Sequence, residues 1–271
     1  MNIRRNVLAG WLVALSILLP GCGSSDLIQN LGANERFELG KQKFESEDYI
    51  EATSHFEIVK LQFPGSDVAD DAQLFLGECH YNQGEFLVAA EDYRALKRNM
   101  PASSLVPDAQ FKIAMCYYQL TPSSNLDQSS GEKAIDEFQA FIEYYPVHPL
   151  AVDAGARIQE LNTRLARKLY DTALQYLKMD YFKSASIYFE SVVNKYHDTE
   201  FAEPSLFGKA RALFARKRYQ EAKDELEKFT LKYPHSALQS EAASLHRDIE
   251  AQMESESNSL GPNKLSTIDH N

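Results

Sequence analysis

The pattern of small, aromatic and proline positions along the chain repeats five times. An alanine is followed four residues later by an aromatic residue or leucine, and proline follows eight residues after that in four of the five instances. The instances are Ala52/Phe56/Pro64, Ala89/Tyr93/Pro101, Ala134/Phe138/Pro146, Ala185/Phe189/His197 and Ala222/Leu226/Pro234. A fixed period of this kind is typical of helical hairpins, which bury their apolar faces by stacking on one another. The pattern therefore predicts an all-α solenoid of about five helical hairpins.

The upstream half of each unit supports this interpretation. Leu39-Gly40 and Leu76-Gly77 precede their alanines by the same distance, and Ile113-Ala114 takes this place in the third unit. Small residues on both helices let the helices approach closely, and proline ends the second helix because it lacks an N–H and clashes with the preceding turn. The arrangement resembles the tetratricopeptide repeat, with about three residues added to each unit.

Two interruptions divide the array. The segment Gln119–Lys133 contains Thr121–Asn125 and Ser129–Gly131, and it predicts a surface loop in the third unit. Between Pro149 and Asp180, apolar residues recur at steps of three and four, which predicts one helix of about 28 residues and about 40 Å. We expect units one to three at residues 33–148, the long helix with units four and five at 149–251, and a disordered tail at 252–271.

The first residues have the pattern of an export signal. Arg4-Arg5 precede the apolar run Val7–Leu19, and Leu19-Pro20-Gly21-Cys22 resembles a bacterial lipobox. This predicts a signal peptide at 1–21, a lipidated Cys22 and a tether at 22–32; the alternative is an ordinary signal peptide with an incidental cysteine. Gly23 rather than Asp after the cysteine resembles the pattern of lipoproteins sorted to the outer membrane. We expect an outer-membrane, lipid-anchored protein facing the periplasm.

The charge distribution is uneven. The formal charge of −11 becomes −13 without Arg4 and Arg5, which argues against nucleic-acid binding. Residues 33–101 carry 14 acidic and 7 basic side chains, whereas residues 163–235 carry 10 acidic and 14 basic ones. The basic residues Arg211, Arg216, Lys217 and Arg218 form a candidate docking surface for an acidic partner. The alternative is a solvated surface.

The sequence offers little for catalysis. The seven histidines show no metal-ligand spacing, and neither a phosphate-binding loop nor a nucleophile elbow is present. We therefore expect no enzyme activity, no cofactor and no metal. Cys79 and Cys116 occupy equivalent places in units two and three, and we favour two buried free thiols over a disulfide, because first helices of neighbouring units pack about 8–10 Å apart.

In a tetratricopeptide-like stack, the first helices line a concave face that suits an extended peptide. Counting from the Leu-Gly pair gives a candidate peptide-binding groove with aromatic, apolar and a few polar side chains. Its residues are Phe37, Lys41, Phe44, Leu74, Glu78, Tyr81, Phe111, Met115 and Tyr118. The alternative is that some of these side chains belong to the core.

Several local runs resemble the BamD (YfiO) family. They are Phe138–Phe141, Tyr145–Pro149, Arg164–Lys168 followed by Tyr170, and Tyr196–Thr199. Together with the lipobox and the two-part layout, the resemblance implies an outer-membrane lipoprotein scaffold of the β-barrel assembly machinery. It implies docking on the periplasmic domains of the barrel insertase through the C-terminal units, and reception of targeting strands of unfolded barrel proteins by the N-terminal units. Other assembly lipoproteins are implied partners.

Two other interpretations stay open from the sequence. One is another periplasmic repeat lipoprotein, acting in pilus assembly or in the coordination of cell division. The other is a periplasmic hydrolase, which requires a polar cluster with perturbed pKa values in the groove. The groove residues do not supply such a cluster.

Overall fold

The computed structural model describes residues 31–123 and 126–259. This part of the chain folds into α-helices only, which confirms the all-α prediction. The helices are α2 (Ala33–Glu45), α3 (Tyr49–Gln62), α4 (Ala69–Asn82), α5 (Phe86–Asn99), α6 (Val106–Gln119), α7 (Ser129–Tyr144), α8 (Ala151–Lys178), α9 (Phe182–Lys195), α10 (Ala202–Ala215), α11 (Tyr219–Lys232) and α12 (Gln239–Ser259).

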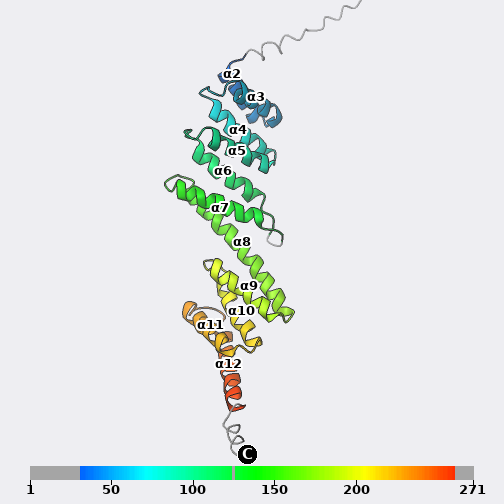
Figure 1. Ribbon diagram of the computed structural model, residues 1–271, viewed down its shortest axis with the longest axis vertical. Coiled ribbons are helices and arrows are strands. Elements are labelled where there is room, and N and C mark those ends of the chain that lie inside the picture. The colour runs from blue at the N-terminus through cyan, green and yellow to red at the C-terminus, as the bar shows by residue number, and fades with distance from the viewer. Residues whose placement is uncertain (1–30, 124–125, 260–271) are drawn as a thin grey trace, which may run out of the picture.

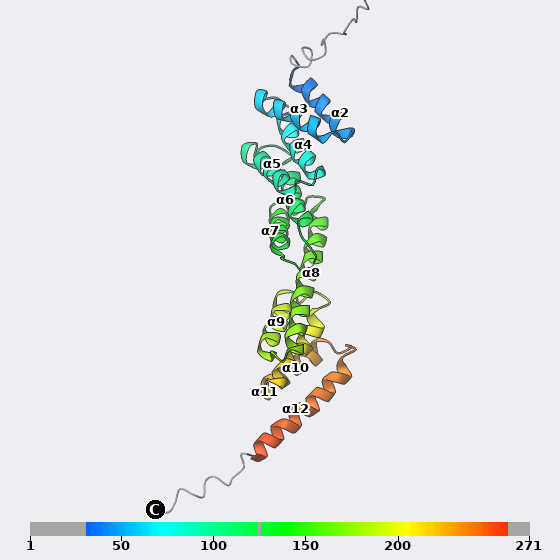
Figure 2. The same cartoon turned by 90° about the vertical axis from the view of Figure 1, so that its right-hand side faces the viewer.

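The helices follow one another along the long axis of an elongated molecule (Figure 1). Each packs mainly on the helix before it and the helix after it. The hairpins are α2–α3, α4–α5, α6–α7, α8–α9 and α10–α11, and α12 covers the last one (Figure 2). Five stacked hairpins are the tetratricopeptide-like solenoid that the sequence predicts.

Proline marks the end of the second helix in four units. These helices end two residues before the proline, at Gln62, Asn99, Tyr144 and Lys232, and α9 likewise ends two residues before His197. Proline cannot donate the next helical hydrogen bond and disfavours helical geometry at the residue before it. The boundaries of the repeats therefore follow from local chemistry.

The glycines of the first helices lie against aromatic rings of the second helices. A Cβ atom added at Gly40 would lie 2.6 Å from Cε1 of Phe56, and one at Gly77 would lie 2.4 Å from Cε1 of Tyr93. Both rings are fully buried. Side-chain packing at these points thus requires glycine, as the repeat pattern predicted.

The long helix α8 has 28 residues, as expected from the spacing of its apolar positions. Its Leu161 and Leu165 belong to a core shared with α6 and α7. Its Ala173 belongs to a second core shared with α9 and α10. One continuous helix therefore closes the third hairpin and opens the fourth (Figures 1 and 2).

A left-handed residue forms the turn between the two helices of four units. These residues are Glu47, Gly84, Asp180 and Lys217, with φ between 60° and 79°. The third unit has the inserted loop at this place, and none of its described non-glycine residues has a positive φ. The third hairpin therefore turns in a different way from the others.

The inserted loop is shorter than predicted. Ser129, Ser130 and Gly131 form the first turn of α7, so the expectation that they belong to the loop is wrong. The buried Gln128 side chain, just before the helix, donates to the carbonyl oxygens of Ser123 and Leu126. These hydrogen bonds hold the end of the loop and allow α7 to begin early.

The predicted disordered tail is wrong for residues 252–259, because α12 continues to Ser259. Met253 packs on the core between α10, α11 and α12, which explains the extra turns. The rest of the tail, the signal peptide, Cys22 and the tether as far as residue 30 lie outside the described residues. Among the described helices, none has the length and apolar composition needed to cross a membrane.

Candidate functional site

Two of the predicted groove residues are core residues. Phe37 and Phe111 are each 6% exposed. The Phe37 ring packs 5.6 Å from that of Phe56, and the Phe111 ring packs 5.5 Å from that of Phe138. Phe37 lies three residues before Gly40, so it shares the helix face that packs on α3. The prediction that these two rings line a groove is therefore wrong.

The other predicted groove residues are half-buried and lie on the first helices of the N-terminal units. We call this set the first-helix face, and it comprises Lys41, Phe44, Leu74, Glu78, Tyr81, Met115 and Tyr118. Contacts join neighbouring helices along it. The Phe44 ring lies 5.3 Å from Phe75 of α4, and Lys112 of α6 lies 5.5 Å from the Tyr81 ring.

Three aromatic residues of the first-helix face recur at the same position in successive units. Phe44, Tyr81 and Tyr118 are each 37 residues apart and lie near the ends of α2, α4 and α6. In the first two units the ring also closes its own hairpin, because Phe44 contacts Tyr49 at 5.4 Å and Tyr81 contacts Phe86 at 5.2 Å. These rings thus have a structural role and a partly exposed surface.

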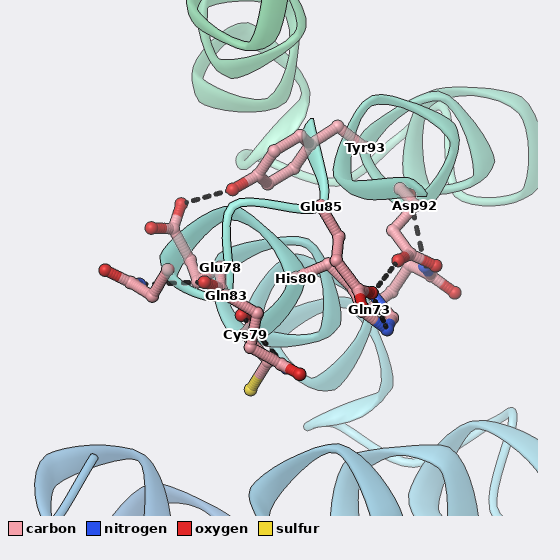
Figure 3. A network of polar contacts seen from close by, with 9 residues as sticks. Gln73, Glu78, Cys79, His80, Gln83, Glu85, Asp92 and Tyr93 are labelled. Atoms are coloured by element: carbon pink, nitrogen blue, oxygen red, sulfur yellow. Dashed lines mark hydrogen bonds and ion pairs between the residues drawn. The ribbon is translucent and has the colours of Figure 1, made fainter. Parts of the chain in front are cut away.

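Glu78 of α4 connects three helices through its side-chain contacts. Its carboxylate accepts a hydrogen bond of 2.8 Å from the Tyr93 hydroxyl of α5, as Figure 3 shows. It also pairs with Lys112 of α6 at 2.8 Å. Burial, reinforced by the Glu78 charge, raises the pKa of Tyr93 well above its usual range. Since its carboxylate already has these partners, Glu78 is a weaker candidate for ligand binding than the sequence suggested.

A second set of polar contacts joins the two helices of the same hairpin (Figure 3). His80 Nδ1 lies 2.7 Å from Asp92 Oδ2, and Gln73 Nε2 donates to the Asp92 carbonyl oxygen at 3.1 Å. All of these contacts run between α4 and α5. They support the shape of the unit, and no group of His, Cys, Asp or Glu in the described residues could hold a metal ion.

Tyr118 has the most distinctive surroundings on the first-helix face. The guanidinium groups of Arg157 and Arg164 lie 4.9 Å and 5.5 Å from the centre of its ring. Its hydroxyl donates to Glu160 at 2.7 Å. Burial alone raises the pKa of Glu160, but the hydrogen bond from Tyr118 and the pairing with Arg164 outweigh it and lower that pKa.

Arg157 and Arg164 were not predicted as part of this face. In the sequence, Arg157, Glu160 and Arg164 recur at steps of three and four, which places them on one side of the long helix. Without the fold, nothing showed that this side of α8 lies against Tyr118. Cationic groups over an aromatic ring are attracted by its quadrupole, so the three side chains hold one another in place.

The predicted docking cluster is less uniform than its sequence suggests. Arg211 and Lys217 are exposed, and Lys217 is the turn residue between α10 and α11. Arg218 pairs with Glu221, and Arg216 donates to the Ser186 hydroxyl at 3.4 Å. Arg216 and Arg218 line a cleft of about 370 Å³ between α9, α10 and α11.

Acidic side chains share this cleft with the two arginines. Glu190, Asp224 and Glu225 also line it. Lys209 lies between two of them, 3.0 Å from Glu190 and 3.2 Å from Glu225. The surface is therefore of mixed charge, and Arg216 and Arg218 supply its positive charge at the α10–α11 turn.

The two described cysteines are free thiols in separate cores, as predicted. Cys79 packs with α2 and α3, whereas Cys116 packs with α5. Burial raises the pKa of Cys79 to about 11 and that of Cys116 to about 12. Both thiols are fully protonated at neutral pH, so neither is a candidate nucleophile.

The fold and its aromatic first-helix face define a class of protein, an all-α solenoid of tetratricopeptide-like repeats. Residues 205–236 match the tetratricopeptide repeat family itself. Residues 29–215 match the YfiO family, described as outer membrane lipoprotein. The chain belongs to this family, which is also the family of BamD.

One curated relative is the outer membrane protein assembly factor BamD of Caulobacter vibrioides. It is 26% identical over 221 residues, which are 80% of this chain and 72% of the relative. The resemblance to the BamD family is thereby confirmed.

Solved structures with a similar fold include two tetratricopeptide domains. The P58(IPK) domain has a TM-score of 0.42 and 17% identity, over 85% of this chain and 58% of that one. The TPR2AB domain of yeast Sti1 has a TM-score of 0.37 and 14% identity, over 80% and 98% of the two chains.

Proposed function

We propose that the protein is a periplasm-facing lipoprotein scaffold of the β-barrel assembly machinery, anchored in the outer membrane through Cys22. The family match over residues 29–215 carries this proposal, because it spans the first four hairpins and the whole of α10. The name of the Caulobacter relative, an outer membrane protein assembly factor, supports it. The function is binding rather than catalysis, since Glu78 and the hydroxyl groups of Tyr81 and Tyr118 already have hydrogen-bond partners within the fold.

The first-helix face would bind the targeting strands of unfolded barrel proteins. Phe44, Tyr81 and Tyr118 present half-buried rings at regular intervals along three stacked hairpins. Aromatic rings give large contact area at a low cost in conformational entropy, and an extended peptide can meet them in succession. Lys41, whose one ion pair among the described residues is a long one of 3.8 Å to Glu38, adds a cation near the Phe44 end.

The C-terminal hairpins would dock on the periplasmic domains of the barrel insertase. Arg216 is half-buried in the cleft between α9, α10 and α11, and the only hydrogen bond that its guanidinium group makes among the described residues is the long one to Ser186. A cation in that position can pair with an acidic side chain of a partner. Arg218 and Lys217 extend the positive charge around the adjoining turn.

Co-purification in mild detergent tests the proposal. The tagged full-length chain, expressed in its own host, should recover a large outer-membrane barrel protein together with other lipoproteins. A chain with Cys22→Ser should fail to remain with the outer membrane. Recovery of pilus-secretion or cell-division components in place of the barrel protein would replace the assembly function by that of another repeat lipoprotein.

Charge reversal tests the docking surface within the same experiment. Arg216→Glu combined with Arg218→Glu should lower recovery of the barrel protein, with the larger effect at low ionic strength, where surface charges are least screened. Arg98→Glu is the matched control, because Arg98 is an exposed arginine on α5, far along the array. Equal recovery from all three chains would remove the docking role of the cluster.

A further inference from the structure

The third unit lacks the aromatic pair that closes the four other hairpins. In units one, two, four and five, an aromatic residue near the end of the first helix contacts another one five residues later, as in Phe214–Tyr219 at 5.7 Å. The residue five positions after Tyr118 is Ser123, and the inserted loop follows α6 there. The Tyr118 ring contacts Arg157 and Arg164 of α8 as described above. This end of the first-helix face therefore has no closing aromatic ring, and two arginines with Glu160 surround Tyr118 there.

A pocket of about 440 Å³ lies between the loop after α6, the middle of α8 and the two residues that precede α10. Arg164 contacts the Tyr118 ring and also lines the pocket. Arg167, Thr121, Ser123 and Phe201 are among the other lining residues. Arg164 thus connects the first-helix face with the pocket.

The walls of the pocket are fixed by hydrogen bonds between distant segments. Lys168 Nζ donates to the carbonyl oxygen of Leu126 at 2.6 Å, which holds the inserted loop on α8. Gln159 Nε2 donates to the carbonyl oxygen of Asp198 at 3.3 Å, which holds the α9–α10 turn on α8. The Phe201 ring packs 5.6 Å from that of Tyr170. The pocket is therefore preformed.

The charges of the pocket suit an anion. Arg167 is exposed, and its only ion pair among the described residues is a long one of 3.7 Å from Nε to Asp171. Its two terminal nitrogens make no hydrogen bond in the described part of the chain. Glu200 is the one acidic residue among those that line the pocket, against two arginines. Arg164 is already paired with Glu160, so Arg167 is the arginine of the pocket with free donors within the described residues. A guanidinium group with free terminal N–H donors matches the two oxygens of a carboxylate.

We infer that this pocket is a carboxylate subsite that sets the direction of a bound peptide. The carboxylate pairs with Arg167 and Arg164, the apolar side chain next to it packs on Phe201, and the preceding residues cross Tyr118 toward Tyr81 and Phe44. This inference rests on the proposed binding of peptides by the first-helix face. The shared chemistry is a carboxylate, supplied either by the end of the peptide or by an acidic side chain.

Three synthetic peptides separate these sources. The first is Ac-Val-Gln-Tyr-Ser-Val-Phe with a free terminal carboxylate and no acidic side chain, and the second is its terminal amide. The third is the amide in which Asp replaces Ser. Affinities for the soluble chain that begins at residue 23 are measured by fluorescence anisotropy of labelled peptides. The free acid should bind about tenfold more tightly than the amide, because a charge-assisted hydrogen bond is lost.

Arg167→Gln locates the effect. This variant should bind the free acid and the amide with equal affinity, whereas Arg98→Gln, which removes one exposed arginine elsewhere, should keep the tenfold preference. Because Arg167 is exposed and makes one long ion pair, helicity and unfolding midpoint should be unchanged. Arg167→Lys should restore part of the preference, since it returns the charge without the planar fork.

The outcomes are distinct. If the Asp-containing amide binds as tightly as the free acid, both sources of carboxylate use the subsite. Equal binding of free acid and amide by the unaltered chain, or a tenfold preference that survives Arg167→Gln, would overturn the subsite and leave peptide binding intact. If none of the three peptides binds the unaltered chain, the peptide-receptor function itself fails and the subsite fails with it.

Discussion

The close approach of helices at Gly77 gives a prediction that can be worked from the structure. A methyl group at this position would lie 2.4 Å from Cε1 and 2.7 Å from Cδ1 and Cζ of Tyr93. The Tyr93 ring is fully buried, and its hydroxyl donates to Glu78, so it has no free space into which it can move. Gly77→Ala must therefore displace the ring or separate α4 from α5.

The magnitude follows from three contributions. Overpacking of a core costs about 1–3 kcal/mol, and the displaced ring would also weaken its hydrogen bond to the Glu78 carboxylate, at about 1 kcal/mol. Alanine is favoured over glycine in a helix by about 1 kcal/mol, which opposes the loss. We expect a net destabilisation of about 2 kcal/mol for Gly77→Ala.

Gly155→Ala is the matched control. Gly155 is an interior residue of α8, and a Cβ atom added there meets nothing within 4 Å. The helix propensity is then the only contribution, so this variant should be more stable by about 1 kcal/mol. The two substitutions are chemically identical, and they should shift stability in opposite directions.

Urea unfolding followed by far-ultraviolet circular dichroism measures both variants. Gly77→Ala should unfold at a urea concentration about 1 M lower, for a slope of about 2 kcal/mol per molar. Tyr93→Leu in the same chain should be less harmful in the presence of Gly77→Ala than alone, because the smaller side chain makes room for the methyl group. If Gly77→Ala is neutral or stabilising, the packing argument for the repeat is refuted.

Three further predictions concern thiols, acid sensitivity and a turn. Cys79 and Cys116, with pKa values of about 11 and 12, should resist a thiol reagent at neutral pH in the folded chain and react fully in urea. Burial, and to a smaller extent the charge of Arg36, lowers the pKa of His55, so His55 binds a proton more readily in the unfolded chain than in the folded one. The free energy of unfolding, measured by urea titration, should therefore fall as the pH is lowered below about 6.5. The fall should be smaller in His55→Leu. Lys217 has a φ of 60°, so Lys217→Gly should raise the free energy of unfolding by about 1 kcal/mol, whereas Lys217→Val should lower it.

Local spacing explains why much of the fold could be predicted. The contact of Gly77 with Tyr93 joins residues of one hairpin, and the repeat pattern shows the same pair as Gly40 with Phe56 in unit one. The length of α8 also follows from the sequence, since its apolar positions recur without proline between Pro149 and Asp180. Features set within one unit, or within one helix, leave a periodic signal.

Features that depend on contacts between units were harder to predict. Phe37 was assigned to the groove because it is aromatic and evenly spaced, but its ring is covered by Phe56 of its own hairpin together with Phe75 of the next one. The pairing of Tyr118 with Arg164 joins residues that are 46 positions apart, and the inserted loop separates them in the sequence. No spacing rule reports such a contact, because it requires the third hairpin and α8 to be placed first.

Site-specific photocrosslinking in the native envelope tests most directly whether the first-helix face receives unfolded barrel proteins. A photoreactive phenylalanine analogue would replace Tyr118, and in a control chain it would replace Tyr144, which is 73% exposed at the end of α7. The account predicts crosslinks from position 118 to newly exported barrel proteins, and none from position 144. Crosslinks of equal yield at both positions, or none at position 118, would contradict it.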